Sequence, residues 1–209
     1  GPSGNGYFYS AYTFATPEHG GTHLDAPIHF AEDAPTVGDL DINELYAPVV
    51  VIDVIAHANT DRNYRVLPAD IEAFEAQHGM IAAGTAVLIR TGWSRFWPEL
   101  NAYLGDDTPG NADNLSFPGI AAETAELLAQ RQVALIGIDT ASIDYGATTA
   151  FPVHVVLASN EIPALENLTN LSAVPETGAW ILAAPMKIGE GSGAPARVVA
   201  FVRRNRAAE

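Results

Sequence analysis

Three of the six histidines in this 209-residue chain lie within eleven residues, in the segment EHGGTHLDAPIHF. His19, His23 and Asp25 have the side chains and the spacing of metal ligands. The chain has no cysteine, so a metal here must be held by imidazole and carboxylate groups. Two imidazoles and one carboxylate suit Zn²⁺, Mn²⁺ or Fe²⁺ and leave coordination positions open. An open site favours hydrolysis, because a metal acidifies water and polarises a carbonyl.

The backbone of this segment is predicted to turn tightly instead of forming a helix. Gly20 and Gly21 separate the two histidines and would let both imidazoles converge. In an extended chain His23 and Asp25, two residues apart, share a face. His29 is interpreted as a fourth ligand or as a general base beside the site. A single histidine is more often structural, but three beside an aspartate and two glycines favour a metal site.

A second group of polar residues lies far along the chain, in FPVHVVLASNEIPALENL. His154 and Glu166 could be ligands, with Glu161 between them. Taken alone, this segment favours the structural alternative, a histidine on a short helix and a solvated glutamate. The other two histidines, His57 and His78, are interpreted as a loop residue and a helix-end residue.

Two further segments have polar or glycine-rich patterns. The segment GIDTASID lies at the end of a buried strand and contains four polar residues, Asp139, Thr140, Ser142 and Asp144. These residues either line a ligand site at the end of the strand or cap a turn. GEGSGAP precedes a strand and not a helix, so we interpret it as a hairpin loop and not as a phosphate loop. The chain has no Gly-x-Ser-x-Gly motif, which gives a serine hydrolase no support.

Composition limits the classes of function. The net charge of −15 argues against nucleic acid and anionic membranes as partners. No run of 18 apolar residues is present, so no transmembrane helix is predicted. The opening GPSGNG has no signal-peptide pattern and is interpreted as a loop or a tag remnant, with the natural N-terminus expected upstream. We expect one domain over residues 1–209 and a cytoplasmic location, with periplasmic or secreted locations left open.

Apolar runs and helix boundaries predict an α/β domain with a mixed sheet curled toward a barrel. The helix at 67–79 has Pro68 at its start and Gly79 at its end, and the next is expected to have Pro118 at its first position. A third, short helix is predicted at 151–161. The predicted strands are 7–15, 48–56, 84–93, 133–144, 180–188 and 196–204.

The segment HGGTHLDAPIHF resembles the signature of the metal-dependent cyclase-like hydrolases, which include bacterial kynurenine formamidase and isatin hydrolase. VLIRTGW, IGIDTASID, LENLTNL and ILAAPMKIGEGSGAPARVVAF resemble later blocks of that family, in the same order. The resemblance implies a swivelling mixed α/β fold around a small β-barrel-like sheet, assembled as homodimers or larger homo-oligomers. It also implies hydrolysis of an amide-type C–N bond in an aryl formamide or cyclic amide. Family members normally carry an N-terminal block before the motif, and we expect part of that block to be missing here.

Carried over by position, the resemblance makes His19, His23 and Asp25 ligands of a first metal and gives His29 the acid/base role. It raises His154 and Glu166 to ligands of a second metal, with Asp25 bridging the two. In the isatin hydrolase branch the position of Glu166 is not acidic and the site holds one metal, often manganese. Glu166 therefore favours the two-metal type, with Zn or Mn as the ions.

The sequence thus predicts a metal-dependent amidohydrolase acting on a small molecule, with one or two divalent ions per subunit. We expect Phe30, Trp93 and the tyrosines near Tyr7 to line a pocket for an aryl group, although they could equally be core residues. The alternatives are a cyclase, lyase or dehydratase on the same metal site, and a non-catalytic protein that binds a metal or small ligand on this scaffold. The presence of His29 discriminates between an enzyme and a non-catalytic binding protein, because a binding protein needs no further imidazole beside the metal ligands.

Overall fold

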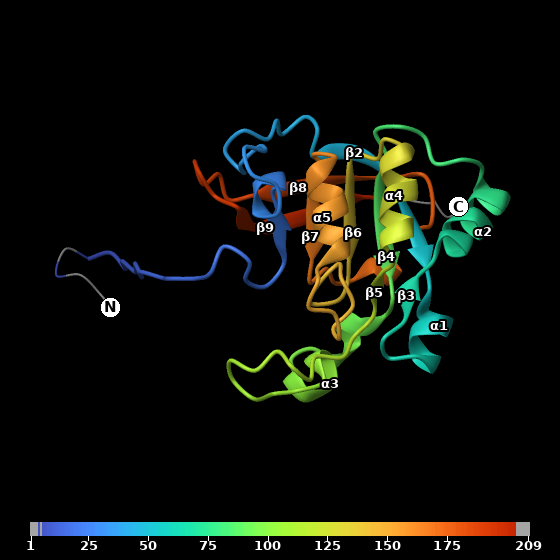
Figure 1. The fold of residues 1–209 in the computed structure, drawn as a ribbon. Helices are drawn as coiled ribbons and strands as arrows, with labels where there is room; N and C mark the ends of the chain where they lie inside the picture. The colour runs from blue at the N-terminus through green and yellow to red at the C-terminus, as the bar shows by residue number, and fades with distance from the viewer. Residues whose placement is uncertain (1–3, 5, 204–209) are drawn as a thin grey trace, which may run out of the picture.

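A closed β-barrel forms the centre of the computed structural model, which describes residue 4 and residues 6–203 (Figure 1). The strands follow one another around the barrel in the order β1-β7-β6-β4-β2-β8-β9, and β9 pairs with β1 to close it. β2, β4, β6 and β7 are parallel to their neighbours within this run, whereas β1, β8 and β9 pair antiparallel. The bounds are β1 (His23–Asp25), β2 (Tyr46–Asp53), β4 (Ala86–Arg90), β6 (Leu135–Ile138), β7 (Ala164–Glu166), β8 (Ala179–Pro185) and β9 (Gly193–Phe201).

Helices and a small second sheet cover part of the barrel. α4 and α5 pack side by side over the parallel strands (Figure 1). The two-stranded sheet consists of β3 (Arg65–Val66) and β5 (Gly119–Ile120). The α-helices are α1 (Ile55–Thr60), α2 (Pro68–His78), α3 (Leu100–Leu104), α4 (Ala122–Gln130) and α5 (Pro152–Ser159), and the 3-10 helices are η1 (Pro27–His29), η2 (Trp93–Phe96) and η3 (Leu171–Ala173). None of these helices is long and apolar enough to cross a bilayer.

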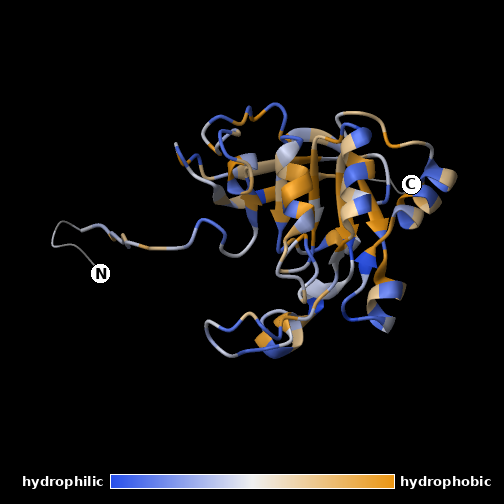
Figure 2. Ribbon diagram, viewed as in Figure 1, coloured by the Kyte–Doolittle hydropathy of each residue, from blue (hydrophilic) through white to orange (hydrophobic). Residues whose placement is uncertain are grey.

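Alternation along the strands divides the core into two layers. Leu88 belongs to one cluster of buried side chains, together with Leu24 and Leu165, whereas its neighbour Ile89 belongs to the other, together with Leu128 of α4. Successive side chains of a strand point to opposite faces, so a strand buried on both faces must be apolar throughout. Figure 2 shows this continuous hydrophobic colouring along the central strands.

Most predicted elements are confirmed, and so is the mixed α/β fold around a barrel. The strands expected at 48–56, 84–93 and 133–144 are β2, β4 and β6, and those expected at 180–188 and 196–204 are β8 and β9, with residue 204 outside the described part. α2 begins at Pro68 and is followed by Gly79, as predicted. GEGSGAP lies at the β8–β9 connection, and its last residues belong to β9. The opening GPSGNG lies largely outside the described residues.

Two predictions were wrong. Residues 7–15 form no strand element, and this segment instead runs away from the barrel (Figure 1). Aromatic residues favour strands where a pleated, half-buried surface receives them, but Tyr12 is 94% exposed. Helix α4 begins at Ala122 and not at Pro118, because the backbone N–H of Gly119 donates to Tyr64 and that of Ile120 to Ile143. These bonds hold residues 119–120 extended as β5.

Candidate metal centre

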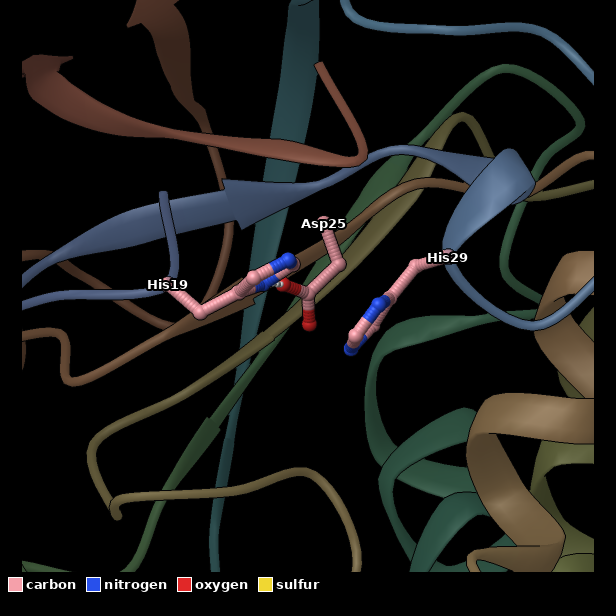
Figure 3. Close-up of side chains that lie close together, drawn as sticks. All are labelled: His19, Asp25 and His29. Atoms are coloured by element: carbon pink, nitrogen blue, oxygen red, sulfur yellow. Dashed lines mark hydrogen bonds and ion pairs between the residues drawn. The ribbon is translucent and has the colours of Figure 1, made fainter. Parts of the chain in front are cut away.

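The candidate metal ligands come from four parts of the fold and meet at one side of β1. His23 and Asp25 are on β1, and both are buried. Figure 3 shows His19, from the loop before β1, and His29, from η1, on either side of Asp25. The two remaining residues of the group are His154 on α5 and Glu166 on β7. All six residues that the sequence singled out as ligands or acid/base group are therefore brought together.

The barrel register explains this convergence. His23 is the cross-strand partner of Glu166 in the antiparallel β1–β7 pair. Because side chains alternate along β1, His23 and Asp25 point to the same face, while Leu24 between them points to the barrel core and is fully buried. Two strands that lie far apart in the sequence thus present an imidazole and a carboxylate to each other.

Asp25 lies at the middle of the cluster. Its Oδ1 is 2.6 Å from Nδ1 of His19 and 3.2 Å from Nε2 of His23, and its Oδ2 is 3.5 Å from Nε2 of His154. Burial opposes ionisation of this carboxyl, but the imidazoles of His154, His19 and His23 beside it outweigh burial and hold its pKa well below the ordinary value. Asp25 is therefore a carboxylate at neutral pH that faces histidines on both of its oxygens.

Glu166 supplies a second carboxylate between the same imidazoles. Its Oε2 is 3.4 Å from Nε2 of His23, and its Oε1 is 3.2 Å from Nε2 of His154. The backbone N–H of Ile143 donates to Oε1 at 2.9 Å and fixes the carboxylate in place. Glu166 is buried, so it is not the solvated glutamate of the structural alternative.

The donor set fits a divalent metal. Nδ1 of His23 donates to the carbonyl of Gly21 at 2.8 Å, which leaves Nε2 as the ring's unprotonated atom in a neutral imidazole. This Nε2 and Oδ2 of Asp25 are buried and have no hydrogen-bond partner among the described residues. Burying unpartnered polar atoms is costly, and a cation would satisfy both.

The site contains two sets of donor atoms, and the atoms within each set lie close enough to one another to hold an ion. They are His19 with Asp25 and His29, and His23 with Asp25 and Glu166; within each set the atoms lie within 4.8 Å of one another. Asp25 is common to both sets, so one carboxylate could serve two ions. His29 is a member of the first set, and the geometry therefore allows it to be a ligand or a neighbouring base.

His29 is a neutral imidazole beside the cluster. Its ring stacks on that of His19, with centroids 3.9 Å apart and the planes 23° apart. Partial burial, followed by the charge of His19, lowers the pKa of His29 to about 4. A neutral imidazole at pH 7 can accept a proton from water.

His154 is held by Asp144, which the sequence left undecided between a ligand site and a capped turn. Asp144 Oδ2 is 2.7 Å from Nδ1 of His154, and the two Asp144 oxygens also accept the backbone N–H groups of Val153 and His154. Burial disfavours the charged imidazole, but the neighbouring carboxylates of Asp144, Asp25 and Glu166 outweigh burial and raise its pKa to about 11. The signal for Asp144 was its place in GIDTASID.

The rest of GIDTASID stabilises turns. Asp139 is buried and accepts the Thr91 hydroxyl at 2.6 Å and the Trp93 backbone N–H at 3.1 Å. The Thr140 hydroxyl donates to the carbonyl of Ser142. The strand end therefore combines both alternatives: Asp144 reaches the metal centre, and the others hold the backbone.

The candidate substrate-binding residues lie in different surroundings. The ring of Phe30 is 4.6 Å from that of His154 and 5.6 Å from that of Phe151, next to the cluster. Trp93 is only 2% exposed, and its indole N–H donates to the backbone carbonyl of Tyr103. The tyrosines near Tyr7 belong to the segment that runs away from the barrel (Figure 1).

The remaining candidates lie apart from the cluster. His57 is largely exposed on α1, 3.7 Å from Asp70. His78 is at the end of α2, where its Nε2 is 3.1 Å from Glu176. Glu161 is exposed after α5. Their interpretation as structural or surface residues agrees with these positions.

Comparisons of the sequence and the structure with known proteins all find hydrolases or the cyclase family. The model of the cyclase family, described as "Putative cyclase", matches residues 4–145. An isatin hydrolase of Roseibium aggregatum is 33% identical over 207 residues, covering 95% of this chain and 77% of that protein. A kynurenine formamidase of Polaromonas naphthalenivorans is 32% identical over 183 residues, covering 87% and 70%. A crystal structure of an isatin hydrolase bound to the product analogue thioisatinate superposes with a TM-score of 0.87 at 32% identity, covering 97% of this chain and 79% of that one.

Proposed function

This chain belongs to the cyclase family, and we propose that it hydrolyses the amide-type C–N bond of an aryl formamide or a cyclic aryl amide. Relatives with about one-third identity over most of the chain are an isatin hydrolase and kynurenine formamidases, so the chain is a metal-dependent hydrolase with a small-molecule substrate. Isatin is a cyclic amide fused to an aromatic ring, and a formamidase cleaves a formyl amide. Both substrate classes share a carbonyl attached to nitrogen.

The single observation that carries the proposal is the arrangement around Asp25. Three imidazole nitrogens lie within 3.5 Å of its two oxygens, and an unpartnered nitrogen of His23 is buried beside it. Glu166 faces two of the same imidazoles. A purely structural cluster would leave no buried donor or acceptor unsatisfied.

The ligands we assign are His19, His23, Asp25, His154 and Glu166. Their mixture of nitrogen and oxygen donors suits Zn²⁺ or Mn²⁺. A divalent ion held there would polarise the substrate carbonyl and acidify water. One or two ions per subunit fit the donors, and Asp25, which is common to both sets of close donor atoms, could be shared by two ions.

His29 would carry the proton in this reaction. Its neutral imidazole takes a proton from the attacking water and passes it to the leaving nitrogen. Phe30 and Phe151 offer aromatic faces beside His154 for an aryl group. Trp93, which the sequence assigned to the substrate, would act by holding the loop after β4 through its bond to Tyr103.

The assembly, extent and location remain proposals. We infer one domain over residues 1–209, a homodimer or larger homo-oligomer, and a cytoplasmic location. The exposed rings of Tyr46, Trp180 and Phe201 cluster on neighbouring strands and support a contact with a second copy. Sedimentation velocity of the purified chain would test the oligomer.

Metal loading paired with turnover tests the function. Wild-type protein loaded with Zn²⁺ or Mn²⁺ is assayed on N-formylkynurenine, isatin and related cyclic amides, with ion content measured by mass spectrometry. We expect His19→Ala and His23→Ala to lose bound metal and hydrolysis together, while His57→Ala keeps both. Retention of metal and hydrolysis in both site variants would show that the assignment is wrong.

A further inference from the structure

Both ring nitrogens of His19 have partners on opposite sides of the ring. Nδ1 lies 2.6 Å from Oδ1 of Asp25, and Nε2 lies 2.9 Å from the hydroxyl oxygen of Ser192. Ser192 belongs to the glycine-rich connection between β8 and β9, which the sequence indicated only as a hairpin loop. This connection therefore reaches the metal centre.

Glu18 determines the direction of the Ser192 hydrogen bond. The Ser192 hydroxyl donates to Oε2 of Glu18 at 2.8 Å, and the Ser192 backbone N–H donates to the same oxygen at 3.0 Å. A serine hydroxyl has one hydrogen to donate, and Glu18 receives it. Ser192 can then only accept from His19, so Nε2 of His19 carries a proton and only Nδ1, which lies against Asp25, remains for a metal.

This direction selects Nδ1 of His19 as the atom that faces Asp25. His23 and His154 have the opposite arrangement, since their Nδ1 atoms bond Gly21 and Asp144 and their Nε2 atoms face the carboxylates. The tautomer of a metal-binding histidine is set by the hydrogen bond at its other nitrogen. His19 is thus held in a different ligating mode from its two neighbours.

The same connection also positions the ring of His19 by contact. A Cβ at Gly193 would come within 2.4 Å of Cε1 of His19, so only glycine leaves room for the imidazole. His29 stacks on the ring at 3.9 Å between centroids. The Ser192 carbonyl accepts the backbone N–H of Ala26 at 2.9 Å, which ties the connection to the end of β1.

We propose that Glu18 and Ser192 form a relay that fixes the Nε2-protonated tautomer of His19, so that His19 binds the metal through Nδ1. Glu18 and Ser192 are positioning residues, because each acts through His19. The inference rests on the proposed metal site and goes beyond it by assigning a role to the β8–β9 connection.

The experiment compares Zn²⁺-loaded wild type with Ser192→Ala, Glu18→Gln and Ser192→Thr. Long-range ¹H–¹⁵N spectra of ¹⁵N-histidine-labelled protein show which nitrogen of His19 carries the proton, and competition with a chelator gives the Zn²⁺ affinity. We expect an Nε2 proton in wild type, a loss of this signal in Ser192→Ala and a fall in affinity of about 10–100-fold. Ser192→Thr, which keeps the hydroxyl, should restore both readouts.

Two further variants separate the relay from general damage. Ser172→Ala removes an exposed hydroxyl on η3 and should change neither readout. Gly193→Ala should displace the ring and lower Zn²⁺ affinity while the Glu18–Ser192 bond remains. If folded Ser192→Ala and Glu18→Gln both keep the wild-type spectrum and affinity, the relay is wrong although the metal site stands. A wild type that binds no Zn²⁺ would overturn the proposed metal site and this inference together.

Discussion

His23 and Glu166 are cross-strand partners on β1 and β7, and Nε2 of the histidine lies 3.4 Å from Oε2 of the glutamate. The pair exists because β7 is placed between β1 and the parallel strand β6 in the closed barrel. The pairing of β1 with β7 therefore brings these two ligands together. A metal bound by both residues would join two strands that are distant in sequence.

Replacing Glu166 by glutamine should remove one ion. The amide oxygen of Glu166→Gln can still accept the N–H of Ile143, so the fold should be retained, but the negative charge between two imidazoles is lost. We expect the affinity for the more weakly bound ion to fall at least about tenfold. Titration calorimetry and ion counting on Zn²⁺-loaded protein measure this effect.

Glu161→Gln is the matched control for that change. Glu161 is exposed, and its replacement should leave the ion count at the wild-type value. Equal ion content and affinity in Glu166→Gln and wild type would mean that Glu166 is not a ligand.

The local half of the site could be predicted from the sequence, for a physical reason. His19, His23 and Asp25 lie within seven residues, so their convergence depends on one turn and one short strand. Two glycines and a two-residue spacing are enough to indicate that geometry. The apolar strands of the barrel were predicted for a similar reason, since a strand buried on both faces leaves a continuous apolar run.

The distant half depended on tertiary structure. His154 and Glu166 had no local pattern that separated ligands from structural residues, and the resemblance to a family supplied them. Ser192 was missed because it lies next to His19 only once β9 has paired with β1. Asp144 stayed undecided because the sequence did not show how the loop after β6 places it against His154. Residues 7–15 were wrongly predicted as a strand because aromatic composition does not reveal whether a surface is there to receive them.

His29→Gln should separate proton transfer from metal binding. A glutamine has no basic nitrogen, so if His29 is the acid/base group, kcat should fall by about 10²–10⁴-fold while the ion content stays the same. If His29 is instead a fourth ligand, ion content should fall with kcat. Steady-state kinetics and ion counting on the same sample distinguish these results, with the exposed His57→Gln as the control. A wild-type kcat in His29→Gln would exclude both roles.

Asp144→Asn should weaken metal binding through His154. An asparagine has one acceptor oxygen in place of two, so it cannot bond Nδ1 of His154 and both backbone N–H groups at the start of α5 as Asp144 does. We expect about 10–100-fold weaker Zn²⁺ binding and a free energy of unfolding lower by about 1 kcal/mol. Asp70→Asn is the matched control, because Asp70 accepts the backbone N–H of Leu67 at the start of α2, away from the metal centre. It should lose stability without losing metal affinity; equal Zn²⁺ affinity in Asp144→Asn and wild type would contradict the role of Asp144.

Metal uptake should release protons and strengthen with pH. The pKa of His154 is raised to about 11 from an ordinary value of 6.5, because three neighbouring carboxylates outweigh burial. In the metal-free protein this raised pKa stabilises the fold fully below pH 6.5, and the contribution is lost as pH rises through about 11. Between these values a metal must displace the proton on Nε2, so we expect about one proton to be released from His154 and an affinity that rises with pH.

Calorimetric titration with Zn²⁺ at pH 7 in buffers of different ionisation enthalpy measures the released protons. His154→Gln should release about one proton fewer than wild type, because glutamine has no proton to lose at this pH. His78→Gln, which changes a histidine on α2, should release the wild-type number. A wild-type binding enthalpy that does not depend on the buffer would show that His154 either carries no proton before the metal binds or does not ligate it.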